Sequence, residues 1–271
     1  MLLKAVRATL KPELLVWRAL HRLSGLSVDL KLELDLYDRP AYAYGIARAA
    51  AQANALGIQS ILALEFGVAS GHGLLAMERI ADDIERATGV SVTPVGFDTG
   101  QGLPAPTDYR DLPYLYSAGF YPMEAEALKG RTRRADLILG DVRETVPAFL
   151  ERTAAVPVGF VSVDLDYYSS TRDALQIFEG DPARYLPRVL VYLDDIASAA
   201  ALHTRFTGEL LAVDEFNAKH QHMKIDQVHG LAWSRTIPAQ WNEQMYAWHR
   251  FDHPLYAEPA DEDAESHVAP L

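Results

Sequence analysis

The sequence predicts a doubly wound α/β fold with a mostly parallel, seven-stranded sheet and an antiparallel hairpin at one edge. Between residues 57 and 256, short apolar runs alternate with segments of helical spacing. The runs are apolar at almost every position, which is typical of strands that helices cover on both faces. Most runs end in glycine or aspartate, residues that favour turns and loops. Right-handed crossovers then place these loops, and any ligand, along one edge of the sheet.

The elements follow this rhythm from the start of the chain. Residues 1–56 form a predicted helical extension that closes with an alanine-rich helix over 41–56. The domain that follows, residues 57–256, contains five apolar runs expected as parallel strands: 60–67, 91–98, 135–141, 158–164 and 187–195. Helical spacing predicts helices between and after these strands at 73–89, 143–152, 170–178 and 207–220.

The pattern changes after Lys224. Residues 227–235 and 245–251 have the composition of strands, and the loop between them contains Pro238. We expect these two segments to pair as an antiparallel hairpin at the edge of the sheet. Residues 257–271 are acidic and poor in large apolar side chains, which predicts a disordered tail.

Composition narrows the range of partners. The chain has 271 residues, a formal net charge of -12 and no cysteine. An acidic surface disfavours nucleic acids and anionic membranes, and the lack of cysteine excludes disulfides and thiolate zinc sites. The sequence shows no signal-peptide pattern and no uncharged run as long as a membrane helix. We therefore expect a cytoplasmic protein whose partners are small molecules, with no nucleic acid and no membrane among them.

The segment from Glu65 to Gly73 is rich in small residues and lies where a strand gives way to a helix. Small residues let the backbone approach a ligand closely. The spacing differs from the G-x-G-x-x-G order of pyrophosphate-binding loops, and the carboxylate of Glu65 repels phosphate. The same carboxylate attracts the ammonium group of an amino-acid ligand, and S-adenosylmethionine carries such an ammonium and no phosphate. The alternative is a glycine-rich turn that binds no ligand.

Aspartates end the second and third predicted strands. Asp98 is expected to accept hydrogen bonds from ribose hydroxyls, as acids at this position do in nucleoside-binding α/β folds. The alternative for Asp98 is an aspartate that begins a turn. Asp141 is expected to bind the adenine amino group while Val142 packs on the ring. The alternative for Asp141 is the N-cap of the next helix, and the two roles are compatible.

The densest group of acids follows the fourth and fifth predicted strands. Asp164 and Asp166 end the fourth strand, and Asp194 and Asp195 end the fifth. Neighbouring parallel strands bring these carboxylates to one edge, where like charges raise one another's pKa. A hard divalent cation with oxygen ligands offsets such a cluster, so Asp164, Asp194 and Asp195 are candidate metal ligands. The alternative is that Asp166 and Asp195 are helix caps or surface acids.

Two groups of side chains beyond the strand ends are further candidates. Histidines are candidates for a general base, with a solvated or structural role as the alternative. They are His72 in the glycine loop and, after the fifth strand, His203, His220, His222 and His229. The aromatic run 109–121 is expected either to close over an acceptor as a lid or to pack as a loop on the domain. Its central aromatic residues are Tyr114, Tyr116 and Phe120.

Five segments occur in an order that is typical of one enzyme family. They read EFGVASGHG, FDTGQGLP, VDLDYYSSTRDAL, VYLDDI and GELLAVDEF. Over about residues 58–220 the chain resembles the class I S-adenosylmethionine-dependent methyltransferases, and within them the macrocin O-methyltransferase-like (TylF-like) group. This resemblance implies a Rossmann-like methyltransferase fold, a divalent metal, and methylation of a sugar hydroxyl on a natural product.

The residues and the resemblance together define a predicted site. The residues predicted to contact S-adenosylmethionine are Glu65, Gly67, Ala69, Ser70, Gly71, Asp98, Thr99, Asp141 and Val142. Asp164, Asp194 and Asp195 are predicted to hold a divalent cation, expected to be Mg²⁺, that lowers the pKa of the acceptor hydroxyl. Asp164 and Asp166 are the predicted catalytic residues, and either Asp166 or a nearby histidine takes the proton.

Two alternative functions stay open at this point. A nicotinamide-dependent oxidoreductase has a similar fold, although the glycine spacing differs and no Tyr-x-x-x-Lys pair is evident. A module that binds the cofactor without catalysis is the other alternative. The small-molecule acceptor is a sugar hydroxyl, a catechol or another oxygen nucleophile, and the N-terminal helical region offers a surface for a homodimer.

Overall fold

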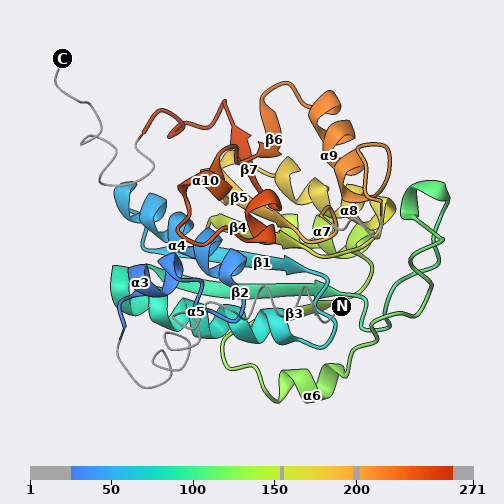
Figure 1. The fold of residues 1–271 in the computed structure, drawn as a ribbon, viewed down its shortest axis with the longest axis horizontal. Coiled ribbons are helices and arrows are strands. Elements are labelled where there is room, and N and C mark those ends of the chain that lie inside the picture. Colours follow the sequence, from blue (N-terminus) through green and yellow to red (C-terminus); the bar gives the residue numbers. More distant parts are fainter. Residues whose placement is uncertain (1–25, 153–155, 198–201, 259–271) are drawn as a thin grey trace.

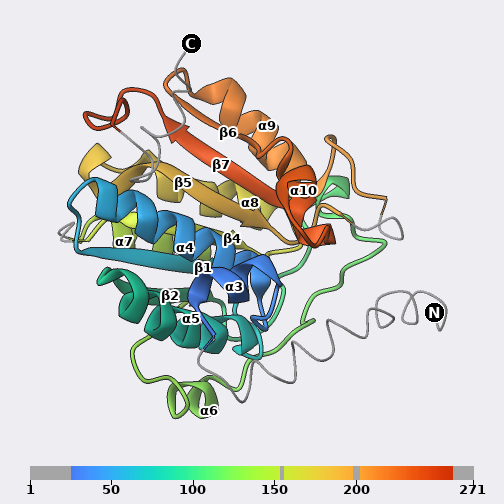
Figure 2. The ribbon, with the colours of Figure 1, turned by 60° about the vertical axis from the view of Figure 1, so that its left-hand side comes forward.

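The computed structural model describes residues 26–152, 156–197 and 202–258. Within these ranges a seven-stranded sheet lies between two layers of helices (Figures 1 and 2). The predicted fold class is confirmed, since the sheet is mostly parallel and carries an antiparallel pair at one edge. None of the helices in these ranges combines the length and the apolar character needed to cross a membrane.

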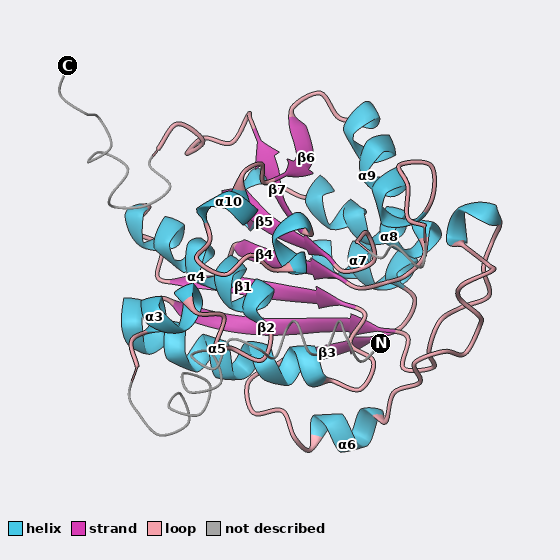
Figure 3. Cartoon of the chain, viewed as in Figure 1, coloured by secondary structure: helices cyan, strands magenta, loops and turns pink. Residues whose placement is uncertain are grey.

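The strands are arranged in the order β3-β2-β1-β4-β5-β7-β6. The parallel strands are β1 (Ser60–Phe66), β2 (Ser91–Asp98), β3 (Asp136–Leu139), β4 (Val158–Val163) and β5 (Tyr185–Leu193). The last strand, β7 (Met245–Arg250), runs antiparallel between β5 and β6 (Met223–Gln227). Figure 3 shows β1 and β2 side by side with their carboxyl ends toward the same edge. The strand order reverses between β1 and β4, which is where doubly wound sheets bind their ligands.

Helices cover both faces of the sheet (Figure 2). One layer contains α3 (Val28–Glu33), α4 (Pro40–Ala55) and α5 (His72–Thr88), and the other contains α7 (Val142–Leu150), α8 (Tyr168–Ala174) and α9 (Gly208–Lys219). Two short helices, α6 (Ala125–Lys129) and α10 (Leu231–Ser234), lie in connections. Short 3-10 helices occupy Tyr109–Asp111, Leu175–Glu179, Pro182–Arg184 and Gln240–Glu243.

Helix α5 illustrates how the sequence builds a layer. Its buried apolar face recurs every three or four residues and consists of Leu74, Met77, Ile80, Ala81 and Ile84. Burying one such large aliphatic side chain stabilises the fold by roughly 1.5–3 kcal/mol. Gly71 and Gly89, with φ angles of 81° and 76°, bound the helix at its two ends. The packed face fixes the start of α5, and therefore the glycine loop before it, against the sheet.

The predicted helical extension, residues 1–56, is described from residue 26 onward and includes α3 and α4 in that part. Tyr42 and Ile46 on α4 are buried in the same core as the sheet. Residues 1–25 and the end of the predicted tail, 259–271, lie outside the described residues. Within the described part, α4 therefore belongs to the domain core.

The edge hairpin corrects one prediction. The expected strand over 227–235 is wrong, because β6 ends where that segment begins and α10 follows within it. Gly230, with φ 82°, turns the chain so that Leu231 enters the core while Trp233 is 94% exposed. The alternating burial that makes a strand lies earlier in the chain, around the buried Ile225. The partner strand predicted over 245–251 is confirmed as β7.

Candidate active site

A cavity of about 430 Å³ opens at the carboxyl ends of β1, β2, β4 and β5. The predicted site residues that line it are Gly67, Ala69, Asp98, Thr99, Asp141, Val142, Asp164, Asp166, Asp194 and Asp195. The other predicted residues, Glu65, Ser70 and Gly71, lie outside its lining. The fold therefore brings the predicted cofactor residues and the acid cluster to one cavity at the switch point.

The loop after β1 passes very close to the end of β4. At Gly67, with φ 85°, a Cβ atom would lie 1.8 Å from the carbonyl oxygen of Asp164. Only glycine fits this approach, because the positive φ and the contact both exclude a side chain. Ala69 also has a positive φ of 45°, which is uncommon for a residue with a side chain. The loop therefore holds its conformation through contacts with the neighbouring strand ends.

Asp98 at the end of β2 supplies part of that support. Its Oδ2 accepts hydrogen bonds from the backbone N–H groups of Val68 at 2.8 Å and Ala69 at 2.9 Å. Its Oδ1 accepts one from Gly100 at 2.7 Å. The structure thus confirms the turn-forming alternative, and the carboxylate also lines the cavity. A carboxylate oxygen accepts more than one hydrogen bond, so the ribose contact stays a prediction compatible with this geometry.

Glu65 lies behind the glycine loop. The hydroxyl of Tyr42 donates to its Oε1 at 2.9 Å, and the Oγ of Ser162 donates to that hydroxyl at 2.8 Å. Burial raises the pKa of Glu65 to about 8, and its Oε2 has no hydrogen-bond partner in the described residues. A Cβ at Gly73, in the first turn of α5, would lie 1.7 Å from Oε1, so a larger residue there would displace the Glu65 carboxylate. Direct contact between Glu65 and a cofactor ammonium stays a prediction.

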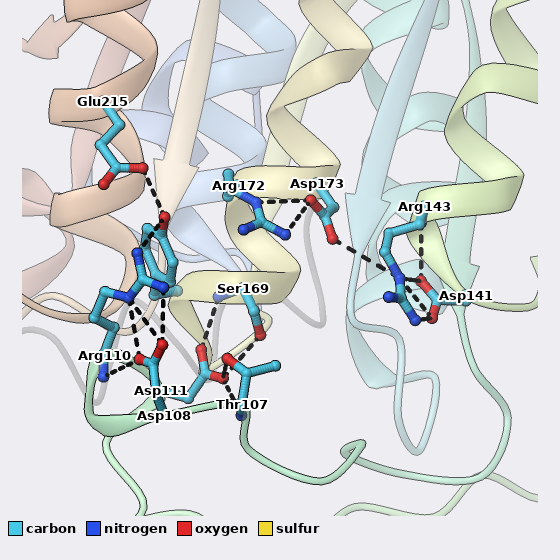
Figure 4. Close-up of polar contacts among 11 residues, drawn as sticks. Thr107, Asp108, Arg110, Asp111, Asp141, Arg143, Ser169, Arg172, Asp173 and Glu215 are labelled. Carbon is cyan, nitrogen blue, oxygen red and sulfur yellow. Dashed lines mark hydrogen bonds and ion pairs between the residues drawn. The ribbon is translucent and has the colours of Figure 1, made fainter.

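Asp141 caps helix α7 and pairs with an arginine (Figure 4). Its Oδ1 accepts from the backbone N–H of Arg143 at 2.9 Å, and the guanidinium of Arg143 lies 2.6 Å from Oδ2. Hydrogen bonds from that guanidinium lower the pKa of Asp141. The N-cap alternative is therefore confirmed. Asp141 and the largely buried Val142 both line the cavity, so their predicted adenine contacts stay predictions that this position permits.

The acid cluster forms where β4 and β5 end side by side. Val163 pairs with Leu193 in the sheet, which places Asp164 next to Asp194. One carboxylate oxygen from each of Asp164, Asp194 and Asp195 lies within 4.8 Å of the other two. Three oxygen donors this close together match the ligand preference of a hard divalent cation.

Burial and mutual repulsion dominate the electrostatics of this cluster. The pKa of Asp164 is raised well above its ordinary value, first by burial and then by the charges of Asp194 and Asp195. The pKa of Asp195 is raised by burial and by Asp194, and that of Asp166 by burial and by Asp195. Deprotonating all of these groups together costs free energy, so the cluster favours a cationic ligand.

Other side chains orient the cluster. The Tyr192 hydroxyl donates to Asp194 Oδ1 at 2.7 Å, and the Tyr116 hydroxyl donates to Asp195 Oδ1 at 3.1 Å. The backbone N–H of Asp166, a residue with φ 60°, donates to Asp195 Oδ2 at 2.9 Å. Both oxygens of Asp195 are thus fixed in place. The predicted alternative for Asp166 and Asp195 as plain surface acids is wrong, because both side chains line the cavity.

A buried glutamate stands directly behind the cluster. Glu209, in the first turn of α9, is 1% exposed and its Oε2 accepts from the backbone N–H of Asp195 at 3.2 Å. Its Oε1 has no partner among the described residues. Burial and the neighbouring Asp195 and Asp164 raise its pKa. Glu209 therefore adds a further acid to the region that a cation would stabilise.

The aromatic segment 109–121 is anchored beside the cavity. Asp111 is fully buried and accepts hydrogen bonds from the backbone N–H and hydroxyl of both Thr107 and Ser169, at 2.6 to 3.0 Å (Figure 4). Tyr121 lines the cavity, and Tyr116 reaches the acid cluster. The exposed aromatic residues of the segment are Tyr109, Tyr114, Phe120 and Tyr121 itself. The segment therefore packs on the domain and contributes two aromatic side chains to the site.

None of the histidines in the described ranges lines the cavity. His72 is exposed and borders a separate hollow, and His220 lies against Phe216 and Glu179. A histidine general base has no support in this geometry, which leaves Asp166 as the candidate. Arg39, Tyr192 and Glu209 are site residues that the sequence does not single out. Arg39 lies before the predicted domain, and the strand and helix patterns around Tyr192 and Glu209 do not reveal their contacts with Asp194 and Asp195.

The comparisons with known proteins concern the fold. No protein-family model matches the chain, and no curated protein resembles its sequence. Among solved structures, CalS11, a calicheamicin methyltransferase, is 21% identical with a TM-score of 0.53, covering 84% of this chain and 87% of that one. The O-methyltransferase NovP is 18% identical with a TM-score of 0.52, covering 78% of this chain and 80% of that one.

The chain has a Rossmann-like methyltransferase fold. At these identities the likeness concerns the fold alone, so cofactor, metal and acceptor are argued from the cavity. The more specific resemblance to the macrocin O-methyltransferase-like group stays a prediction.

Proposed function

We propose that the protein is a methyltransferase that uses S-adenosylmethionine to methylate a hydroxyl group of a small molecule, with a divalent cation, Mg²⁺, at the acid cluster. The observation that carries this proposal is the composition of one cavity. One side of the cavity is formed by the loop after β1, the aspartate at the end of β2 and the aspartate before α7. The other side is formed by the carboxylates that follow β4 and β5. Structural likeness to CalS11 and NovP, both described as methyltransferases, supports the same reaction class.

The cofactor side of the cavity suits a nucleoside joined to an amino acid. Phe97 and Val142 offer apolar surface for a base, and Asp98 offers carboxylate oxygens for ribose hydroxyls. The glycine loop lacks the pyrophosphate-binding spacing, and acids dominate its surroundings. A sulfonium compound with one carboxylate and no phosphate fits this environment better than a dinucleotide does.

The acid cluster fits a divalent cation. Asp164, Asp194 and Asp195 offer three oxygen ligands, and the raised pKa values of Asp164 and Asp195 support a bound positive charge, which would favour their ionised forms. The cation, when bound, supplies Lewis-acid chemistry that lowers the pKa of an acceptor hydroxyl. Tyr192 and Tyr116 hold two of these carboxylates in fixed orientations, which preserves the geometry of the donor set.

Methyl transfer then requires positioning and removal of one proton. The acceptor oxygen attacks the methyl carbon, the carbon–sulfur bond breaks, and its electron pair stays on sulfur to leave S-adenosylhomocysteine. Asp166, whose carboxylate lines the cavity beside Asp195, takes the hydroxyl proton. The aromatic Tyr121 and the loop from Leu103 to Ala105 line another part of the cavity and border the space proposed for the acceptor.

Ligand binding tests the cofactor assignment. In a thermal-shift and calorimetric comparison, S-adenosylhomocysteine should bind and stabilise the protein, by about 2.7 kcal/mol when its concentration is a hundred times Kd. NAD should leave the melting temperature unchanged. Stabilisation by NAD alone would contradict the proposal and favour an oxidoreductase. Binding of S-adenosylhomocysteine without methyl transfer to any member of a hydroxylated acceptor panel, in the presence of Mg²⁺, would favour a non-catalytic module.

A further inference from the structure

Arg39 carries an inference that rests on the proposed function and extends it. Arg39 is the residue before Pro40, at the start of α4, and its side chain lines the cavity. Its guanidinium lies over the ring of Tyr42, 5.6 Å from the centroid. Arg39 therefore reaches the site from the helical layer that contains α4, whereas α8 and α9, which follow the acids in sequence, belong to the other layer.

The arginines that line the cavity differ in how they are paired. Arg143 forms an ion pair with Asp141 at 2.6 Å, and Arg172 forms one with Asp173 at 2.8 Å. In the part of the chain that the structure describes, Arg39 has no such partner, and the neighbouring Asp38 pairs with Arg79 instead. A guanidinium is always charged and has five N–H donors, so an unpaired one in a partly buried position is set to bind an anion.

The surroundings of Arg39 are polarised. On one side lie the acids of the cavity. Burial lowers the pKa of Arg39, whereas the charges of Tyr42, Asp164 and Glu65 raise it, and the net effect is a rise. On the other side Arg39 borders a second hollow of about 310 Å³, whose other basic residues are His72, Arg79 and Arg131. Arg39 therefore lies between the acids of the cavity and this more basic hollow, with Gly67, Ala69 and Asp164 in the same cavity lining.

We infer that Arg39 binds the α-carboxylate at the methionyl end of S-adenosylmethionine. A guanidinium and a carboxylate form two parallel, charge-assisted hydrogen bonds, which fix direction as well as distance. With the carboxylate held at Arg39 and the nucleoside near Asp98 and Val142, both ends of the cofactor would be fixed in the cavity that Asp164 also lines. Arg39 is thus a cofactor-positioning residue.

Calorimetry with two ligands isolates this role. S-adenosylhomocysteine carries the carboxylate, whereas decarboxylated S-adenosylhomocysteine keeps the ammonium and the nucleoside but lacks it. Arg39→Ala should weaken binding of S-adenosylhomocysteine by about 10- to 100-fold, as expected for a lost charged hydrogen-bonding group. The decarboxylated ligand should bind Arg39→Ala as well as it binds the unaltered protein, which also shows that the variant is folded. Arg39→Lys should recover part of the affinity.

Arg79→Ala is the matched control. It removes the same charge from the adjoining hollow, in which Arg79 pairs with Asp38 outside the cavity, and should leave both affinities unchanged. Equal losses for the two ligands, or no loss for S-adenosylhomocysteine, would overturn the assignment. A change in the acceptor KM alone would assign Arg39 to the acceptor and equally overturn it. Failure of the unaltered protein to bind S-adenosylhomocysteine would instead refute the proposed function.

Discussion

The two halves of the cavity differ in how their acids are satisfied. On the side of β2 and α7, Asp98 accepts three backbone hydrogen bonds, and Asp141 caps a helix and pairs with Arg143. On the side of β4 and β5, burial and mutual repulsion raise the pKa values of Asp164 and Asp195. The acids of the first half are balanced by donors and by an arginine of the protein, whereas the charge of the second half would be offset by the proposed cation. The partners of each acid therefore separate the two halves.

The largest expected effect lies in the half that contains the acid cluster. Asp195→Ala removes one of the three donors of the acid cluster and should lower the Mg²⁺-dependent turnover by about 100- to 1000-fold, which corresponds to several kcal/mol of lost charge stabilisation. The Kd of S-adenosylhomocysteine should stay unchanged, because the cofactor residues lie on the other side. Turnover and calorimetry on the same preparation measure both quantities.

Asp214→Ala is the control for that experiment. Asp214 is an acid on α9 that pairs with Arg205 away from the cavity, so its removal changes net charge by the same amount. It should leave turnover unaffected. Activity of Asp195→Ala that equals the unaltered protein and survives chelation would show that the acid cluster has no metal role.

The next effect tests whether a satisfied acid also binds ligand. Asp98→Ala should weaken binding of S-adenosylhomocysteine by about 1–3 kcal/mol, because it removes the ribose partner and releases the N–H groups of Val68 and Ala69. Asp181→Ala is a matched control, since Asp181 accepts a backbone hydrogen bond from Ala183 far from the site. An unchanged Kd for Asp98→Ala, measured by calorimetry, would restrict Asp98 to a turn-forming role.

The acids at the strand ends in both halves could be predicted from the sequence. The strand ends at Asp98, Asp164 and Asp194 follow from apolar runs that stop at an acid, and the topology of a parallel sheet brings them to one edge. That reasoning needs only local pattern and handedness. It also places Asp141, because a strand and a helix flank it in sequence.

What sequence reasoning could not supply is contact between distant elements. Arg39 precedes the first predicted strand and Glu209 lies in the helix after the fifth, and only packing of α4 and α9 on the sheet brings them to the site. Glu65 shows the reverse case, since a residue inside the motif points behind the loop toward Tyr42. The strand expected over 227–235 failed because Gly230 redirects the chain, which an apolar pattern does not reveal.

A smaller effect concerns stability of the cation-free protein. The pKa of Asp164 is raised on folding, so the folded state holds its proton to higher pH than the unfolded state does. Stability from this group is therefore present at low pH and is lost as the pH rises through the raised pKa. As the pH rises above the ordinary titration range of aspartate, the free energy of unfolding should fall less steeply in Asp164→Asn than in the unaltered protein. Chemical denaturation in a chelator measures this.

Addition of Mg²⁺ completes the test of Asp164. The cation should restore stability to the unaltered protein at the higher pH and do little for Asp164→Asn, because binding requires the ionised carboxylate. Parallel pH profiles for the two proteins without the cation would mean that Asp164 is not part of a strained cluster. The contrast between the two halves of the cavity would then lose its electrostatic basis.

The smallest effect separates two roles of one satisfied acid. Asp141→Ala removes the N-cap of α7 and should lower the free energy of unfolding by about 1 kcal/mol. Asp141→Ser keeps an oxygen that can cap the helix, so its stability should lie within a few tenths of a kcal/mol of the unaltered protein. If Asp141 also binds adenine, both variants should bind S-adenosylhomocysteine more weakly, by less than about tenfold. If Asp141→Ser instead matches the unaltered protein in both stability and Kd, Asp141 is a cap alone. A serine hydroxyl replaces the capping oxygen but not the second carboxylate oxygen that a contact with adenine would use.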